Sequence, residues 1–146
     1  MKYLTLLFIL ATTLLYSSDA NENFLKAVQL NDIEKIKSAI ASKADINTAT
    51  SAGNTALLIA CRNRIAYRKI DIIEFLLSKN INVNAVDNNG VSALNISARY
   101  GDAETAKLLI EKKADINLAD NIGTTPLMIS IYFSKNSVAV ILIENG

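Results

Sequence analysis

A repeat with a period of about 33 residues runs through most of this chain. Three glycines mark it, Gly53, Gly90 and Gly123, which are 37 and 33 residues apart. The string Ala-Asp-Ile-Asn occurs at residues 44–47 and again at 114–117. A period of this length predicts a stack of similar units, because one small unit cannot bury its own apolar faces and needs neighbours to cover them.

Each unit has the pattern of two short helices followed by a turn. Thr55, Ser92 and Thr125 stand at matched positions two residues after the glycines, where a hydroxyl can cap the amides of a first helix. In the middle copy, Gly101 predicts a left-handed turn between the first helix and a second one. Residues 114–123 are rich in Asn, Asp and Gly, which indicates an extended turn.

This pattern resembles that of ankyrin repeats. The middle copy matches the family at most of its marked positions: Asp87, Gly90, Ser92, Ala93, Leu94, Gly101, Asp102, Leu108, Leu109 and 114–117. The resemblance covers 21–146, with repeats at about 21–49, 50–86, 87–119 and 120–146, the first atypical and the last truncated. It implies an all-α repeat solenoid of helix-turn-helix units joined by β-hairpin loops, and the binding of another protein as the usual activity.

Three departures from the family pattern stand out. The histidine that normally ties neighbouring hairpins together is absent, so we expect looser polar bonding between repeats; its positions hold Leu58, Asn95 and Met128. The usual glycine after the second helix is replaced by Lys43, Asn80 or Lys113, of which lysine tolerates the left-handed conformation less well than asparagine. Four extra residues, 64–67, lie between the two helices of the second repeat.

The N-terminal residues have the pattern of a secretory signal peptide. Lys2 precedes a dense apolar run at residues 4–16, which is short of the ~20 residues that a membrane-spanning helix needs. Small residues follow, which places cleavage between Ala20 and Asn21. We therefore predict a signal peptide at 1–20 and a secreted or periplasmic protein with no membrane contact after cleavage. The alternative is an uncleaved N-terminal anchor.

The composition argues against an enzyme. The chain has no His and one Cys, which excludes imidazole chemistry, an internal disulfide and a cysteine-rich zinc site. Cys61 matches Ala98 and is predicted to be a small buried residue. Five aspartates are predicted to hold backbone turns or caps: Asp45, Asp87, Asp102, Asp115 and Asp120. We predict no catalysis, no cofactor and no metal site.

Charge gives no reason to expect a nucleic acid as partner. The 15 Lys and Arg residues nearly balance the 14 Asp and Glu residues, so the formal net charge is +1. One local basic cluster lies between the helices of the second repeat: Arg64, Tyr67, Arg68 and Lys69. It is either a solvated loop or a secondary contact for an acidic partner.

The family resemblance implies that the hairpins and first helices line a concave binding face. Core positions repeat between copies, whereas surface positions vary, and arginine and aromatic side chains dominate interface energies. The candidate protein-binding residues are Arg62, Arg99, Tyr100, Tyr132 and Phe133. An equally open alternative is that Tyr132 or Phe133 packs under a neighbouring helix.

The last apolar segment, 138–143, predicts a second kind of contact. Six consecutive apolar residues cover all sides of a helix, so Val140 and Ile143 are expected to point outward. Burying them would support weak self-association, which makes a self-assembling or structural solenoid the alternative function.

Overall fold

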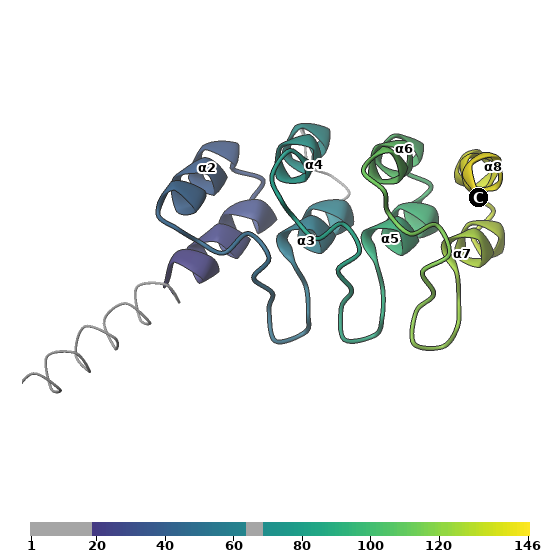
Figure 1. The fold of residues 1–146 in the computed structure, drawn as a ribbon, viewed down its shortest axis with the longest axis horizontal. Helices are drawn as coiled ribbons and strands as arrows, with labels where there is room; N and C mark the ends of the chain where they lie inside the picture. Colours follow the sequence, from purple (N-terminus) through teal and green to yellow (C-terminus); the bar gives the residue numbers. More distant parts are fainter. Residues whose placement is uncertain (1–18, 64–68) are drawn as a thin grey trace, which may run out of the picture.

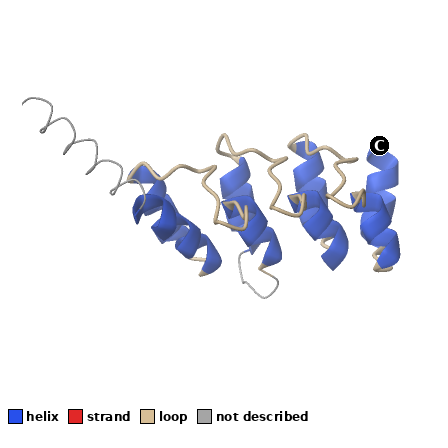
Figure 2. Cartoon of the chain, turned by 90° about the horizontal axis from the view of Figure 1, so that it is seen from below, coloured by secondary structure: helices blue, strands red, loops and turns tan. Residues whose placement is uncertain are grey.

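The computed structural model describes residues 19–63 and 69–146, and within these ranges the regular secondary structure is helical (Figures 1 and 2). An N-terminal helix, described over residues 19–29, precedes the helices α2 to α8. Their bounds are α2 Ile33–Ala41, α3 Ala56–Arg62, α4 Lys69–Leu77, α5 Ala93–Tyr100, α6 Ala103–Glu111, α7 Pro126–Tyr132 and α8 Asn136–Asn145. The described residues form an all-α repeat solenoid, as predicted.

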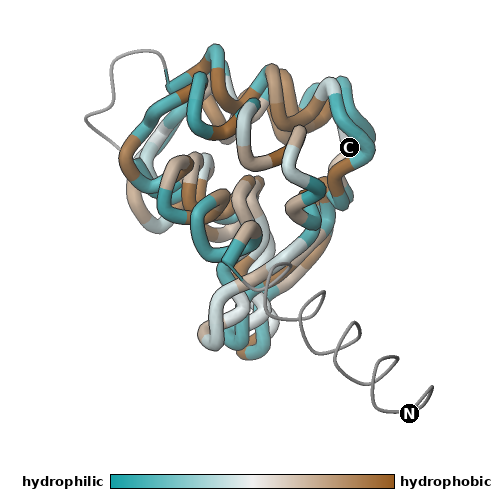
Figure 3. The backbone as a smooth tube through the Cα atoms, turned by 90° about the vertical axis from the view of Figure 1, so that its left-hand side faces the viewer, coloured by the Kyte–Doolittle hydropathy of each residue, from teal (hydrophilic) through white to brown (hydrophobic). Residues whose placement is uncertain are grey.

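The helices are arranged in two layers (Figure 1). One layer contains α2, α4, α6 and α8, and the other contains the N-terminal helix, α3, α5 and α7. Viewed along the stack, the units lie one behind another, and their hairpin-shaped loops project together on one side (Figure 3). Leucines and isoleucines from both layers form the buried core, among them Leu57, Ile73, Leu94, Leu109 and Leu142.

The predicted hydroxyl caps begin the first-layer helices. Thr55 Oγ1 accepts from the Leu58 amide at 3.5 Å, and Ser92 Oγ accepts from the Asn95 amide at 3.2 Å. Thr125 caps α7 in the same way, and Gly101, with a φ of 74°, ends α5 in a left-handed turn. The caps satisfy amides that a helix start otherwise leaves without partners.

The predicted aspartate turns are also confirmed. In the third repeat, Asp87 Oδ1 accepts from the amides of Asn89 and Val91 at 2.8 and 3.0 Å. Asp120 makes the equivalent turn in the fourth repeat, and Asp102 caps α6. The remaining two, Asp45 and Asp115, each accept from the amide two residues later. The loops carry isolated antiparallel bridges in place of longer strands, Ala49 with Thr55 and Val86 with Ser92.

Asparagines replace the missing histidine as polar ties between repeats, which corrects the expectation of looser bonding. Asn88 Nδ2 donates to the Ser51 carbonyl, and Asn121 Nδ2 donates to the Asn88 carbonyl, both at 3.0 Å. A second series of asparagine oxygens accepts amides of the next repeat; these are Asn21, Asn47 and Asn84. Neighbouring loops are therefore connected by side-chain amides in every described unit.

The residues that replace the family's loop glycine behave differently from the sequence expectation. Lys43 and Lys113 adopt left-handed conformations, with φ of 64° and 68°, whereas Asn80 does not. After α4 the chain turns instead through a hydrogen bond from the Ile81 amide to the Lys79 carbonyl. The four extra residues at 64–67 lie outside the described residues.

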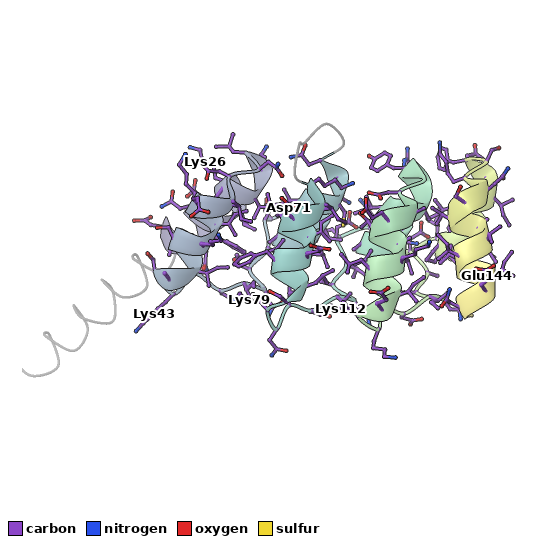
Figure 4. The ribbon with its side chains drawn as sticks, turned by 90° about the horizontal axis from the view of Figure 1, so that it is seen from above. Lys26, Lys43, Asp71, Lys79, Lys112 and Glu144 are labelled. Atoms are coloured by element: carbon purple, nitrogen blue, oxygen red, sulfur yellow. The ribbon has the colours of Figure 1, made fainter. Side chains whose placement is uncertain are left out.

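Charges of both signs are spread along the stack. The six charged residues labelled in Figure 4 run from the first repeat to α8: Lys26, Lys43, Asp71, Lys79, Lys112 and Glu144. In the part of the chain that the structure describes, none of the helices has the length and apolar character needed to cross a membrane. The N-terminal run at 4–16 lies outside that part.

Candidate protein-binding surface

A hollow of about 560 Å³ opens where the hairpin loops meet the first-layer helices of the third and fourth repeats. Its walls come from the loop residues at 87–91 and 120–124 and from α5 and α7, with one side chain from α3. All five candidate residues line it: Arg62, Arg99, Tyr100, Tyr132 and Phe133. The structure therefore brings together side chains that are up to 71 residues apart in the sequence.

Three of these residues occupy one repeat-matched position. Arg62, Arg99 and Tyr132 each lie in the last turn of a first-layer helix, in α3, α5 and α7. Because the repeat carries the position from one unit to the next, the three side chains form a row along the hollow. The row has two arginines followed by an aromatic ring.

Arg62 is held by the loops on both sides of it. Its guanidinium donates to Asn54 Oδ1 in its own repeat and to Asp87 Oδ2 in the next, the latter at 2.7 Å. Asp87 is buried. Burial raises the pKa of the Asp87 carboxyl, but hydrogen bonds from Val91, Asn89 and Arg62 outweigh it and hold the pKa below its ordinary value. The charge of Arg62 is therefore balanced within the protein.

Arg99 has a different environment. Its guanidinium carbon lies 4.8 Å from the centre of the Phe133 ring, and its side chain is exposed. The Phe133 ring in turn meets the Tyr132 ring edge-on, with 5.0 Å between centroids. Arg99, Phe133 and Tyr132 thus form a continuous stacked surface at one side of the hollow.

The structure separates the two predictions made for the aromatic residues. Tyr132 is 81% exposed, so the alternative that it packs under a neighbouring helix is wrong. Phe133 is half-buried beneath the Arg99 guanidinium. Tyr100 is half-buried at the end of α5.

Two further residues that sequence reasoning did not select line the hollow. Ile122, at the tip of the fourth repeat's loop, is 87% exposed. Asn95 is buried, and its Oδ1 completes the cap of α5 by accepting from Ser92, while its Nδ2 has no hydrogen-bond partner among the described residues. The substitution of Asn95 for an apolar residue at this matched position is the signal that could have identified it.

Of the secondary basic cluster, only Lys69 lies within the described residues. Its ammonium nitrogen lies 2.7 Å from Asp102 Oδ2, which joins the start of α4 to the start of α6. Burial raises the pKa of Asp102, but the bonds from Lys69 and Thr105 hold it below its ordinary value. Arg64, Tyr67 and Arg68 lie outside the described residues.

Cys61 is a small core residue, as predicted. Its side chain is buried, and burial raises the pKa of the thiol to about 12. Across residues 19–63 and 69–146, no three His, Cys, Asp or Glu side chains are grouped closely enough to hold a metal ion. The hollow's walls offer hydrogen bonds, rings and one stacked cation, which are the chemistry of recognition.

Stacked helix pairs with a hollow along their loops define this protein as an all-α repeat solenoid of the recognition type. A family model described as ankyrin repeats (3 copies) matches residues 24–120 and 65–146, so the chain belongs to the ankyrin repeat family. Ankyrin repeats are in general protein-protein interaction modules. A search of curated proteins finds no match.

Proposed function

We propose that this protein is a non-enzymatic interaction module that binds a partner protein in the hollow between the third and fourth repeats. The observation that carries the proposal is the convergence of Arg62, Arg99, Tyr100, Tyr132 and Phe133 on one hollow. Exposed aromatic and apolar side chains next to an arginine are the groups that dominate interface energies when a partner desolvates them. Neither catalysis nor a cofactor is needed for this function.

A paired substitution tests the proposed surface. The partner is first captured with the full chain, and its affinity is then measured by isothermal titration calorimetry. Arg99→Ala with Tyr132→Ala should weaken binding by about 2–4 kcal/mol, because both side chains are exposed at the hollow. Glu104→Ala with Lys107→Ala, on the exposed side of α6, is the matched control. Unchanged affinity in the first variant, with native circular dichroism, would place the binding surface elsewhere.

Export is part of the same proposal. It rests on the sequence pattern of residues 1–20: one basic residue, an apolar run and small residues at the end. We propose that the mature protein begins at Asn21 and is secreted or periplasmic. Mass spectrometry of the protein from its native host tests this. A mass that retains residues 1–20 would indicate an uncleaved anchor.

A second candidate function, self-assembly, is favoured by the surface of the fourth repeat. Val140 and Ile143 on α8 are 51% and 64% exposed. Ile131 on α7 is also exposed, whereas the matched Ala98 in the third repeat is buried by the next unit. A second copy stacked on this surface would bury the same positions that neighbouring repeats bury within the chain.

Analytical ultracentrifugation tests the second candidate. Burial of Val140 and Ile143 would contribute roughly 1.5–3 kcal/mol each, which is enough for weak self-association. The wild-type chain should therefore show concentration-dependent association that Val140→Lys with Ile143→Glu removes. A wild-type chain that stays monomeric at high concentration would contradict the self-assembly hypothesis.

A further inference from the structure

The two arginines in the row along the hollow differ in what balances their charge. Arg62 is bound by Asn54 and Asp87. The repeat places Val91 and Asp120 at the corresponding positions around Arg99. Val91 has no side-chain acceptor, and Arg99 makes no ion pair with Asp120 or with any other described residue. The replacement of one asparagine by valine thus removes half of the pair of acceptors that holds the arginine in the preceding repeat.

The stacking of Arg99 leaves its hydrogen-bond donors available. A guanidinium over an aromatic ring is held through its flat face, while its N–H groups lie in the plane of the group. Phe133 holds the Arg99 side chain in this position at 4.8 Å. The exposed edge of the guanidinium therefore presents several donors, already oriented, at the wall of the hollow.

Asn95 adds a second donor on the same helix face. It precedes Arg99 by four residues on α5, so the two side chains lie one turn apart, and both line the hollow. The Asn95 Nδ2 group is buried without a hydrogen-bond partner among the described residues. A buried donor without an acceptor costs free energy, which an acceptor supplied by a bound partner would recover.

The carboxylates of the hollow are already engaged in the fold. Asp87 is used by Arg62 and by two backbone amides. Asp120 Oδ1 accepts from the amides of Ile122 and Thr124. Next to the donors lie the two most exposed apolar surfaces of the site, Ile122 and Tyr132.

We propose that the hollow recognises an acidic segment of the partner, in which an Asp or Glu carboxylate binds Arg99 and an adjacent apolar side chain packs on Ile122 and Tyr132. Asn95 Nδ2 donates to the same carboxylate or to a carbonyl beside it. Arg62, whose charge is balanced, holds the loops and does not select the partner. This inference rests on the proposed function, since it names the chemistry of the partner at that same surface.

Peptide display on the full-length chain tests the proposal. A random peptide library is selected on the immobilised protein, and the best peptide is compared by calorimetry with its neutral version, in which Glu or Asp becomes Gln or Asn. We expect the selected peptides to carry an acidic residue next to an apolar one. The acidic peptide should bind roughly tenfold more tightly than the neutral one, the factor expected of one charge-assisted hydrogen bond.

Three variants distinguish recognition by Arg99 from a general effect on the fold. Arg99→Gln should abolish the preference for the acidic peptide, and Arg99→Lys should retain part of it because the charge remains. Asp120→Asn should strengthen the preference, since it removes a nearby negative charge while its Oδ1 still accepts from Ile122 and Thr124. Circular dichroism confirms that each variant is folded.

The possible failures are distinguishable. Peptides that lose binding in Tyr132→Ala but show no acidic preference, or that carry lysine instead, would overturn the carboxylate inference and leave the proposed binding surface intact. A selection in which no peptide depends on Tyr132, Ile122 or Arg99 would contradict the proposed function itself.

Discussion

Single carboxylates connect neighbouring repeats in this protein. Asp87 holds its own loop through Asn89 and Val91 and holds the preceding repeat through Arg62. Asp102 caps α6 and pairs with Lys69 at 2.7 Å. Each of these groups therefore stabilises a turn and an interface at the same time, and only in its charged form does it bind the cation fully.

The stability of the protein should depend on these two carboxyls in acid. Burial raises the pKa of Asp87 and Asp102, but their hydrogen bonds hold both below the ordinary value of 3.8. The folded state then binds fewer protons than the unfolded state, so the stabilisation is present above the unfolded pKa and is lost as the pH falls through the folded pKa. Urea unfolding should give a free energy that changes little from pH 7 to 5 and falls below about pH 4.

Neutral variants check the assignment of this acid dependence. Asp87→Asn with Asp102→Asn should flatten the acid limb of the profile and lower the free energy of unfolding at pH 7 by about 1–3 kcal/mol, because charge-assisted bonds are lost. A double variant with the same acid slope as the wild type would show that other groups cause it.

At the scale of the element, no helix of this chain is long enough to be stable alone. The helices α2 to α8 have 7–10 residues, whereas an isolated helix needs ~12–15. Caps and turns define where each helix begins, and packing against the next unit supplies the stability. The loops must therefore approach one another closely, which makes their glycines sensitive positions.

Gly90 and Gly123 provide a matched pair for testing this closeness. Both have a positive φ, 76° and 82°, so alanine at either costs about 1–2 kcal/mol in backbone strain. A Cβ at Gly90 would also lie 2.7 Å from the Asn121 backbone nitrogen, whereas one at Gly123 meets nothing within 4 Å. Thermal unfolding should therefore show a clearly larger loss for Gly90→Ala than for Gly123→Ala. Equal losses would mean that the contact between the loops contributes nothing.

At the scale of the whole molecule, ties between repeats make unfolding a property of the stack. Ion pairs join α3 to the next loop and α4 to α6, and asparagine amides join successive loops. Because each unit depends on its neighbour, opening one interface exposes the core of two units. A probe buried within one interface should therefore report on the opening of the stack.

Cys61 is such a probe. Its thiol is buried, and its pKa is raised to about 12, so it reacts only after the stack opens. Labelling with iodoacetamide at pH 8 should be slower than for the unfolded chain by roughly a thousandfold or more, which corresponds to ordinary domain stability. Gly90→Ala should accelerate labelling in proportion to its loss of stability. Rapid labelling of a chain with native circular dichroism would contradict this.

The sequence alone determined the repeat architecture, because that architecture depends on local chemistry repeated at a constant spacing. The glycines, the hydroxyl caps of Thr55, Ser92 and Thr125, and the turn aspartates each act within a few residues of their own position. The period then carries that local structure along the chain. For the same reason, the five candidate residues could be assigned to one face before any contact was known, and all five line one hollow.

Only the tertiary structure decided which of the matched residues differ in role. Arg62 and Arg99 occupy the same position, yet one is balanced by Asp87 and the other stacks on Phe133. The partners come from an adjacent repeat, 25 residues away for Arg62, so they depend on which side chain the next unit presents and on how closely the loops pack. A repeat pattern describes what the units share; the charge left available for a partner arises where neighbouring units differ.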